Sequence, residues 1–324
     1  MMAKRSVPWC LLVLLLSVKA LFAQTAWPQF RGPTGDGLAT AVVDSQIRGL
    51  PVRWSETENV VWKTAIPHVG WSTPVVMDGQ VWLTTATPDG HEFFAICVDA
   101  GTGAIRFHEK LFHADHPEPL GNPMNSYASP SPTMEPGRVY VHFGSYGTAC
   151  LDTKTFEVLW KRDDLPCRHY RGPGSSVILF EDLLILTMDG VDVQYVVALD
   201  KATGRTVWKT DRTAAWDDLD EDGKPRSEGD LRKAYSTPLV VDVQGTQRML
   251  TVGAKAVYGY DPRTGEELWK VNTPGFSGAA SPVYGQGLAF MITGFGKTEL
   301  LAIRPDGRGD VTDTHVVWKT ASMV

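Results

Sequence analysis

The sequence of 324 residues is poor in cysteine, in long apolar runs and in surplus positive charge, and each shortage argues against a class of protein. Its four cysteines include no adjacent pair and no zinc-ligand spacing. A formal net charge of −6 argues against nucleic acid as a main partner, because phosphate binding requires a basic face. The patterns Gly-x-Ser-x-Gly and His-Glu-x-x-His and the phosphate loop are also missing. The sequence therefore lacks the usual signatures of hydrolases, metalloproteases and nucleotide-binding proteins.

The one long apolar run lies at the N-terminus, where Lys4 and Arg5 precede "VPWCLLVLLLSV" and a zone of small residues follows. This order is typical of a secretory signal, and the run is too short to span a bilayer comfortably. We expect residues 1–23 to be a cleaved signal peptide and the protein to be exported to the periplasm or the exterior of a bacterial cell. Cys10 stands in a poor lipid-attachment context, and no later run is long enough to cross a membrane, so we expect a soluble product.

Tryptophan, glycine and proline are plentiful, with 11, 31 and 21 residues, and this composition indicates many short strands and tight turns. The stretch "ALDKATGRTVW" at 198–208 recurs in the same frame at 97–107, 150–160 and 259–269. Each copy follows apolar stretches separated by turn residues. One repeat therefore predicts four short antiparallel strands, which is the pattern of a propeller blade.

The residues of the repeat have physical roles in such a blade. Asp200 can accept hydrogen bonds from backbone N–H groups two or three residues later, and Gly204 can adopt the positive φ of a hairpin. Trp208 offers a large apolar face to the neighbouring blade. A fifth repeat has Arg304 in the place of the aspartate and a longer final turn before Trp318. A two-layer solenoid is the alternative, but four strands and a terminal tryptophan favour a ring.

The pattern Ala-x-Asp-x-x-Thr-Gly-x-x-x-Trp resembles the tryptophan-docking motif of the pyrroloquinoline quinone (PQQ)-like β-propeller repeat family. The repeat at 198–208 matches it fully, and the repeat at 259–269 has Gly259 in the first position. The resemblance covers about residues 58 to 324, and "WPQFRGP" at 27–33 resembles the start of exported bacterial members. The family includes quinoprotein dehydrogenases and non-enzymatic proteins such as the lipoprotein of the outer-membrane β-barrel assembly machinery. The resemblance implies an all-β propeller but not an activity.

We divide the chain into the signal peptide, an N-terminal extension at residues 24–56 and a propeller at residues 57–324. Five full blades of four antiparallel strands are visible in the sequence. Residues 57–62 read as an outer strand with no strands before it. We therefore expect an incomplete propeller, a fragment of a ring of seven or eight blades, with a closed five-bladed ring as the alternative.

Three consecutive connections between blades, at 107–132, 160–177 and 208–238, are longer than the others, and binding sites commonly lie on such loops. The first two carry possible ligand-binding residues, which are His113, His116, Tyr127, Arg168, His169 and Arg171. Histidines with Cys167 are suitable metal ligands, and Arg168, His169 and Arg171 are suited to clamp an anion. Solvated polar loops without a ligand are the alternative.

The third long connection contains Asp218, Asp220 and Asp222 followed by Gly223, a spacing that can direct alternate carboxylates at one Ca²⁺. It departs from the calcium-loop pattern at the twelfth position, where Gly229 replaces glutamate. These aspartates are therefore candidate calcium ligands, and an ordinary acidic loop is the alternative.

Quinoprotein dehydrogenases often hold their quinone beside an adjacent cysteine pair, which this sequence lacks. We accordingly expect no quinone and no catalytic residues. The sequence predicts an exported propeller that binds or scaffolds a protein or extracellular polymer partner. The alternative is a fragment of a PQQ-dependent quinoprotein oxidoreductase.

Overall fold

The computed structural model describes residues 26–38 and 51–321. The predicted signal peptide, residues 1–23, lies outside the described residues, as does much of the predicted extension. Within the described part, no helix is both long enough and apolar enough to cross a membrane.

Five antiparallel sheets follow one another along the described part of the chain. The first holds β1 (Val75–Met77), β2 (Gln80–Ala86), β3 (Glu92–Asp99) and β4 (Ile105–His113). The second holds β5 (Thr133–Glu135), β6 (Arg138–His142), β7 (Thr148–Asp152) and β8 (Val158–Arg162). The third holds β9 (Ile178–Phe180), β10 (Leu183–Asp189), β11 (Gln194–Asp200) and β12 (Thr206–Asp211). The fourth holds β13 (Leu239–Val243), β14 (Thr246–Val252), β15 (Ala256–Tyr260) and β16 (Glu267–Asn272). The fifth holds β17 (Val283–Gly285), β18 (Leu288–Ile292), β19 (Glu299–Ile303) and β21 (Val316–Ala321).

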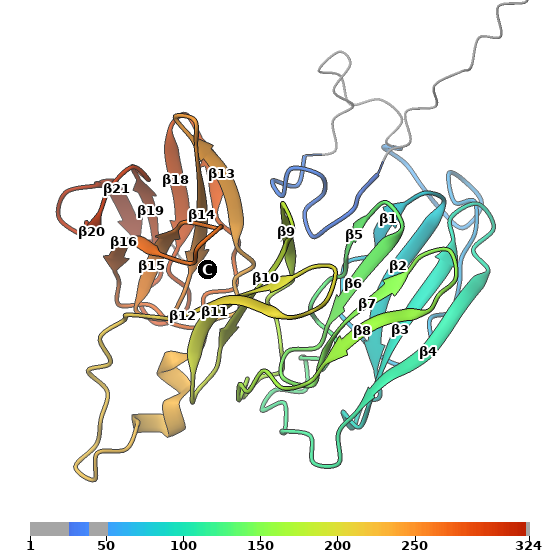
Figure 1. Ribbon diagram of the computed structural model, residues 1–324, viewed down its shortest axis with the longest axis horizontal. Helices are drawn as coiled ribbons and strands as arrows, with labels where there is room; N and C mark the ends of the chain where they lie inside the picture. Colours follow the sequence, from blue (N-terminus) through green and yellow to red (C-terminus); the bar gives the residue numbers. More distant parts are fainter. Residues whose placement is uncertain (1–25, 39–50, 322–324) are drawn as a thin grey trace, which may run out of the picture.

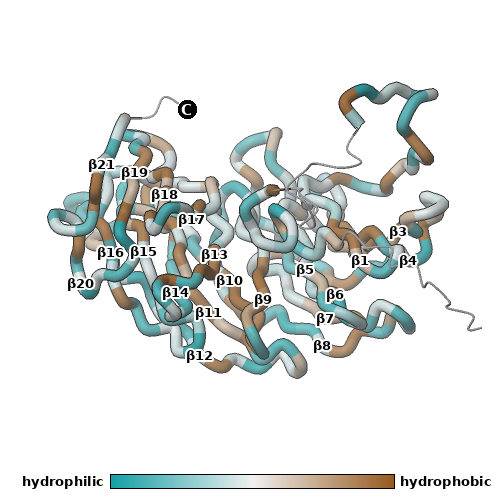
Figure 2. The backbone as a smooth tube through the Cα atoms, turned by 90° about the horizontal axis from the view of Figure 1, so that it is seen from above, coloured by the Kyte–Doolittle hydropathy of each residue, from teal (hydrophilic) through white to brown (hydrophobic). Residues whose placement is uncertain are grey.

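The sheets are the blades of a propeller, as the sequence predicts. Within each blade the strands pair in chain order, and Figure 1 shows the blades side by side in sequence order. Seen from above, they fan out around one axis with β1, β5, β9, β13 and β17 toward it (Figure 2). Short strands joined by tight turns, with the third strand of each of the first four sheets buried on both faces, explain this architecture.

The turn of the repeat forms as predicted. The Asp200 carboxylate accepts hydrogen bonds from the Thr203 N–H at 2.8 Å and the Thr203 hydroxyl at 2.7 Å. Gly204 adopts a φ of 73°, a conformation that few other residues tolerate. The aspartate is therefore used to close a hairpin, and its carboxylate is not available for chemistry.

The tryptophans of the second, third and fourth blades, and Trp62 before the first blade, dock on the turn of the blade that follows. The indole N–H groups of Trp62, Trp160 and Trp269 donate to the carbonyls of Ala100, Lys201 and Pro305 at 2.9, 3.0 and 2.9 Å. A Cβ atom on Gly103, Gly204 or Gly265 would come within 2.7 Å or less of the ring of Trp62, Trp160 or Trp208. The glycine of one repeat therefore makes room for the tryptophan of the repeat before it.

Two segments differ from the sequence prediction. Residues 57–62 form no strand; only Ser55 and Glu58 make an isolated bridge there, although Trp62 docks as described. The longer final turn of the fifth blade contains β20 (Gly309–Asp310), which pairs parallel to β16 of the fourth blade and gives that blade a fifth strand. The extra length of the turn allows it to reach the neighbouring outer strand.

The N-terminal segment, residues 26–38, crosses the inner strands. Trp27 exchanges two backbone hydrogen bonds of 2.8 Å with Val76 of β1, and the Pro28 carbonyl accepts from Met134 N–H of β5 at 2.7 Å. Gly32 has a φ of 79°, and a Cβ there would lie 2.7 Å from the Trp27 ring. The segment is thus fixed against two different blades close to the axis.

Candidate functional site

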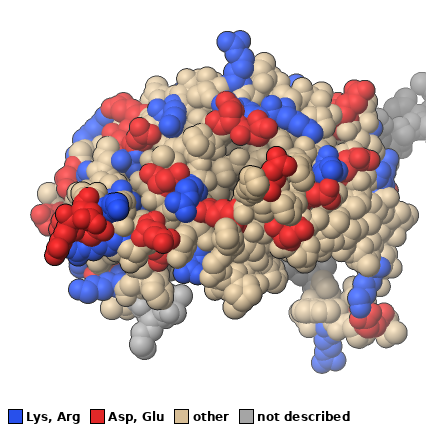
Figure 3. Space-filling model, turned by 90° about the horizontal axis from the view of Figure 1, so that it is seen from below, with Lys and Arg blue, Asp and Glu red and all other residues tan. Residues whose placement is uncertain are grey.

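One face of the propeller gathers the three long connections. We call the surface made by residues 69–74, 114–132, 163–177 and 212–238, together with the shorter loops 143–147, 189–193 and 293–298, the loop face. Figure 3 views the molecule from this side and shows acidic and basic side chains mixed across it. The connections touch one another, because Tyr170 N–H donates to Glu118 at 2.9 Å and the Tyr235 hydroxyl donates to the His169 carbonyl at 3.1 Å.

His169 lies inside this face. Its Nε2 accepts a hydrogen bond from Ser145 N–H at 3.1 Å, which leaves the ring proton on Nδ1, 3.6 Å from the Cys167 sulfur. Burial lowers the pKa of His169 to about 4 and raises the pKa of the Cys167 thiol. Both groups are therefore neutral at neutral pH, and the pair is not an activated thiolate with its base.

The other predicted ligand residues of the second loop hold the connections together. Arg168 Nε lies 3.3 Å from Glu118, and Arg171 donates to the Gly121 carbonyl at 2.7 Å while lying over the Tyr170 ring. Tyr127 is buried, and its hydroxyl donates to the Glu118 carbonyl at 2.8 Å. The structure thus brings Tyr127, Arg168 and Arg171 to the contact between the first two long connections, and it places His169 against Ser145 and Tyr235 instead.

The two remaining residues lie elsewhere. His113 ends β4, where its ring stacks on His91 with centroids 6.1 Å apart and its Nε2 lies 3.2 Å from Asp115. His116 is exposed on the following loop. The predicted residues therefore do not converge on one point, and they stay a prediction as ligand-binding groups.

The three candidate calcium ligands also have separate environments. Asp218 is buried and forms a two-point ion pair with Arg232, at 2.9 and 2.6 Å. The hydrogen bond from Arg232 lowers the pKa of Asp218. Asp220 accepts from the N–H groups of Asp222 and Lys224 and closes its own loop. The described residues hold no group of three His, Cys, Asp or Glu placed to bind a metal, so calcium stays a prediction.

Sequence reasoning missed the buried charges of the loop face. Lys233 is buried between the rings of Tyr170 and Phe276, with its Nζ 5.5 Å from each centroid, and it donates to the Asp230 side chain. Burial lowers the pKa of Lys233. No local sequence signal marks it, because both rings come from other connections.

Large apolar side chains stand exposed on the same face. Trp71, at the entry to β1, is 67% exposed and donates its indole N–H to the Met124 carbonyl at 2.8 Å, and the Met124 side chain is 76% exposed. Phe295, in the loop before β19, is 71% exposed. We call Trp71 and Met124 the Trp71 patch. Exposed aromatic and methionine side chains held side by side are typical of binding surfaces.

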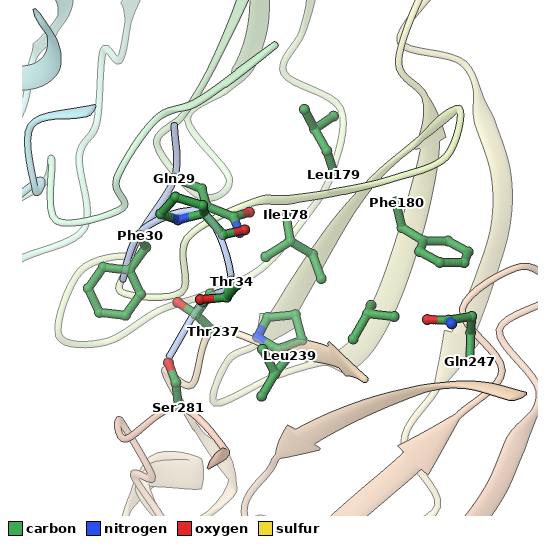
Figure 4. A pocket seen from close by; sticks show the side chains of 14 residues that line it. Gln29, Phe30, Thr34, Ile178, Leu179, Phe180, Thr237, Leu239, Gln247 and Ser281 are labelled. Atoms are coloured by element: carbon green, nitrogen blue, oxygen red, sulfur yellow. The ribbon is translucent and has the colours of Figure 1, made fainter. Parts of the chain in front are cut away.

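A pocket of about 400 Å³ lies at the axis, between the inner strands of the third and fourth blades and the N-terminal segment. Figure 4 shows Gln29 and Thr34 on one side of it, Ile178 above, Leu239 below and Gln247 on the far side. None of the described residues that line it carries a charge. This lining does not fit PQQ, which is a tricarboxylate and requires cations around it.

A comparison with models of known protein families shows which family the chain belongs to. A family model described as outer membrane protein assembly factor BamB matches residues 53–215, half of the chain. The chain belongs to this family of PQQ-like β-propellers. A search of curated proteins by sequence finds no match.

Solved structures agree with the family. BamB from Moraxella catarrhalis is 18% identical with a TM-score of 0.58, and the match covers 82% of this chain and 69% of that chain. The quinohemoprotein alcohol dehydrogenase from Comamonas testosteroni is 14% identical with a TM-score of 0.55, and the match covers 79% of this chain and 43% of that chain. At these identities the likeness shows the fold alone. The PQQ-like propeller predicted from the sequence is therefore confirmed.

Proposed function

We propose that this PQQ-like propeller is an exported scaffold that binds a protein partner through its loop face and has no catalysis of its own. The observation that carries the proposal is the contrast between two sets of side chains on that face. Its buried titratable groups are engaged in internal contacts, while large apolar side chains are presented to solvent.

The polar groups are arranged for structure. A nucleophile needs a base within hydrogen-bond reach and in the right protonation state. The pair Cys167 and His169 has the ring proton directed at the sulfur, and burial keeps the thiol protonated. Asp218 and Arg232 satisfy one another. The Asp218–Arg232 pair fixes the third connection internally, and His169 joins the second connection to Ser145 and to Tyr235 of two other loops, so these residues give the face a fixed shape.

The apolar groups are arranged for contact. Tryptophan and methionine are over-represented where proteins meet, and a tryptophan that is already held by one hydrogen bond loses little entropy on binding. The indole N–H of Trp71 is held by the Met124 carbonyl, so the ring is fixed while its face stays open. The description of the matching family as an outer membrane protein assembly factor favours a protein partner in the periplasm.

The proposal is tested by site-specific photo-crosslinking. A photoreactive amino acid replaces Trp71 or Met124 in the full chain, which is expressed with its own N-terminus in a Gram-negative host. We expect the same protein partner to be captured at both positions and identified by mass spectrometry. Val207 is the matched control, because it is 53% exposed but lies on the outer strand β12, away from the loop face.

Identical crosslinked products from all three positions, or no product from the Trp71 patch, would argue against a scaffold that uses the loop face.

A second function, that of an oxidoreductase, is favoured by the structural similarity to the quinohemoprotein alcohol dehydrogenase. This second function is tested by incubating the purified protein with PQQ and Ca²⁺ and then assaying dye reduction with alcohols and sugars. Saturable, PQQ-dependent dye reduction would replace the scaffold proposal by an oxidoreductase; we expect none.

A further inference from the structure

The axial pocket is formed by parts of the chain that are far apart in sequence. Ile178 and Phe180 of β9 and Leu239 of β13 form its apolar wall, and Ser281 lies just before β17. The N-terminal segment closes it with Gln29 and Thr34. Since the backbone of this segment is hydrogen-bonded to β1 and β5, that wall is held in place without a ligand.

The size of the pocket suits a small ligand. Pockets that bind small molecules occupy roughly 300 to 1,000 Å³, and this pocket, at about 400 Å³, lies at the low end. It combines an apolar wall with a few polar groups at its ends, which is the usual composition of such sites. Figure 4 shows the amide groups of Gln29 and Gln247 on opposite sides of the space.

The polar groups of the lining retain unused hydrogen-bonding capacity. The Gln29 amide nitrogen donates to the Pro33 carbonyl, and the Gln247 amide nitrogen donates to Asp242, so each side chain keeps its oxygen as an acceptor. The Thr237 hydroxyl accepts from Ser176 N–H and keeps its proton to donate. The Ser281 hydroxyl oxygen is buried and has no partner among the described residues.

The two amide oxygens and the Thr237 hydroxyl require a ligand that both donates and accepts. An anion only accepts, and it would face two amide oxygens without a cation to offset its desolvation. A hydroxyl group donates to an amide oxygen and accepts from a hydroxyl proton. A compound with several hydroxyls on a compact frame therefore matches the lining, and its C–H faces match the wall of Ile178 and Leu239.

We propose that the axial pocket binds a neutral polyhydroxylated small molecule, of the size of a single hexose, between Gln29 and Gln247. This inference goes beyond the scaffold function, because the pocket lies at the axis and shares no residue with the Trp71 patch. It also predicts that the N-terminal segment completes the site, since Gln29 and Thr34 belong to it.

The test uses purified full chain and matched sugars. D-glucose, D-mannose and D-galactose are titrated and detected by saturation-transfer NMR and calorimetry, with D-glucuronate as the anionic counterpart of glucose. We expect millimolar or tighter binding of at least one neutral hexose. Gln247→Ala is expected to weaken that binding about tenfold, the usual effect of losing one hydrogen bond. Glucuronate is expected to bind at least about tenfold more weakly than the neutral sugar.

Two further variants separate binding from folding. Gln29→Ala removes an acceptor of the N-terminal segment whose amide nitrogen makes one exposed hydrogen bond of 3.3 Å, so we expect weaker sugar binding with unchanged thermal stability. Gln286→Ala is the control, since Gln286 is exposed in the turn before β18 and outside the lining. No binding of any neutral hexose, equal binding by Gln247→Ala, or preferred binding of glucuronate or PQQ would each overturn the proposal. Crosslinking at Trp71 is expected to be unchanged in Gln247→Ala, so the two proposals fail independently.

Discussion

Arg212 carries its guanidinium across the junction of the third and fourth blades, where it pairs with Asp189 at 2.7 and 2.6 Å. The two side chains are 1% and 2% exposed, and the guanidinium also lies over the Tyr258 ring. Removing one partner of such a pair leaves a buried charge without compensation. We therefore predict that Arg212→Met lowers the free energy of unfolding by about 3 to 5 kcal/mol, measured by urea denaturation.

Arg308→Met is the matched control for this substitution. Arg308 pairs with Glu266 at 2.8 Å, but both side chains are more than half exposed. Solvent screens such a pair, so we expect a loss of less than about 1 kcal/mol. Equal losses in the two variants would contradict the conclusion that burial makes the Arg212–Asp189 pair costly to break.

His169 makes the stability of the protein depend on pH. Its pKa of about 4 in the folded chain lies below the value of about 6.5 expected when the chain is unfolded, so the unfolded state binds the proton more tightly. The contribution of the neutral, buried His169 to the free energy of unfolding is complete above about pH 6.5 and is lost as the pH falls toward 4. We predict that His169→Gln reduces this loss by up to about 1.4 kcal/mol per pH unit, measured by urea denaturation between pH 7 and 4.5.

The exposed His116 supplies the control for the pH experiment. His116→Gln is expected to leave the pH dependence of the unfolding free energy as it is in the unaltered chain, because the His116 side chain is exposed. His142 is also buried, with its pKa lowered to about 3, so part of the pH dependence remains in His169→Gln. A pH profile that His169→Gln leaves unchanged would refute the assignment.

At the scale of the blade, the sequence predicts more than at the scale of the site. The aspartate, glycine and tryptophan of one repeat are visible together, so strands and turns could be placed from them. The docking partner of each tryptophan lies in the next repeat and is set by packing. This explains a departure in the repeats. Phe107 occupies the tryptophan position of the first blade, and Phe156 replaces the turn glycine of the second blade. The two rings stack on one another with centroids 5.3 Å apart.

The site was harder to predict for the same physical reason. Local patterns indicated polar loops, but whether Tyr127 and His169 are exposed depends on their contacts with Tyr146 and Tyr235 of other loops. The axial pocket combines the N-terminal segment with the inner strands of two blades. Its only sequence signal was the stretch "WPQFRGP" at 27–33, which carries Gln29 and Pro33 of the lining.

The docking element offers a matched pair of substitutions. Trp160 donates its indole N–H to the Lys201 carbonyl, whereas the corresponding atom of Trp208 is buried without a partner among the described residues. Replacement by phenylalanine removes similar ring area at both positions but a hydrogen bond at only one. We predict that Trp160→Phe lowers the unfolding free energy by about 1 kcal/mol more than Trp208→Phe, measured by urea denaturation. An equal or smaller loss at Trp160 would show that the indole hydrogen bond does not stabilise the dock.

At the scale of the molecule, docked tryptophans join the second blade to the third, the third to the fourth and the fourth to the fifth. The N-terminal segment joins β1 and β5 near the axis. Repeat proteins with nearest-neighbour contacts transmit a local defect mainly to the adjoining repeats. Trp269 is fully buried at the junction of the fourth and fifth blades. We predict that Trp269→Ala speeds amide hydrogen exchange in β14 to β19 and leaves β2 and β3 of the first blade unchanged, measured by mass spectrometry.

Trp318→Ala is the control for that experiment, since Trp318 occupies the same position in the fifth blade but is 43% exposed. Its ring contacts Phe290 of β18, with centroids 6.0 Å apart, so faster exchange is expected in the fifth blade alone. Faster exchange of β2 and β3 in Trp269→Ala would instead mean that the five blades open as one cooperative unit. The N-terminal segment is hydrogen-bonded to β1 and β5, so we expect it to couple the opening of the first two blades. We expect the junction at Trp269 to open locally.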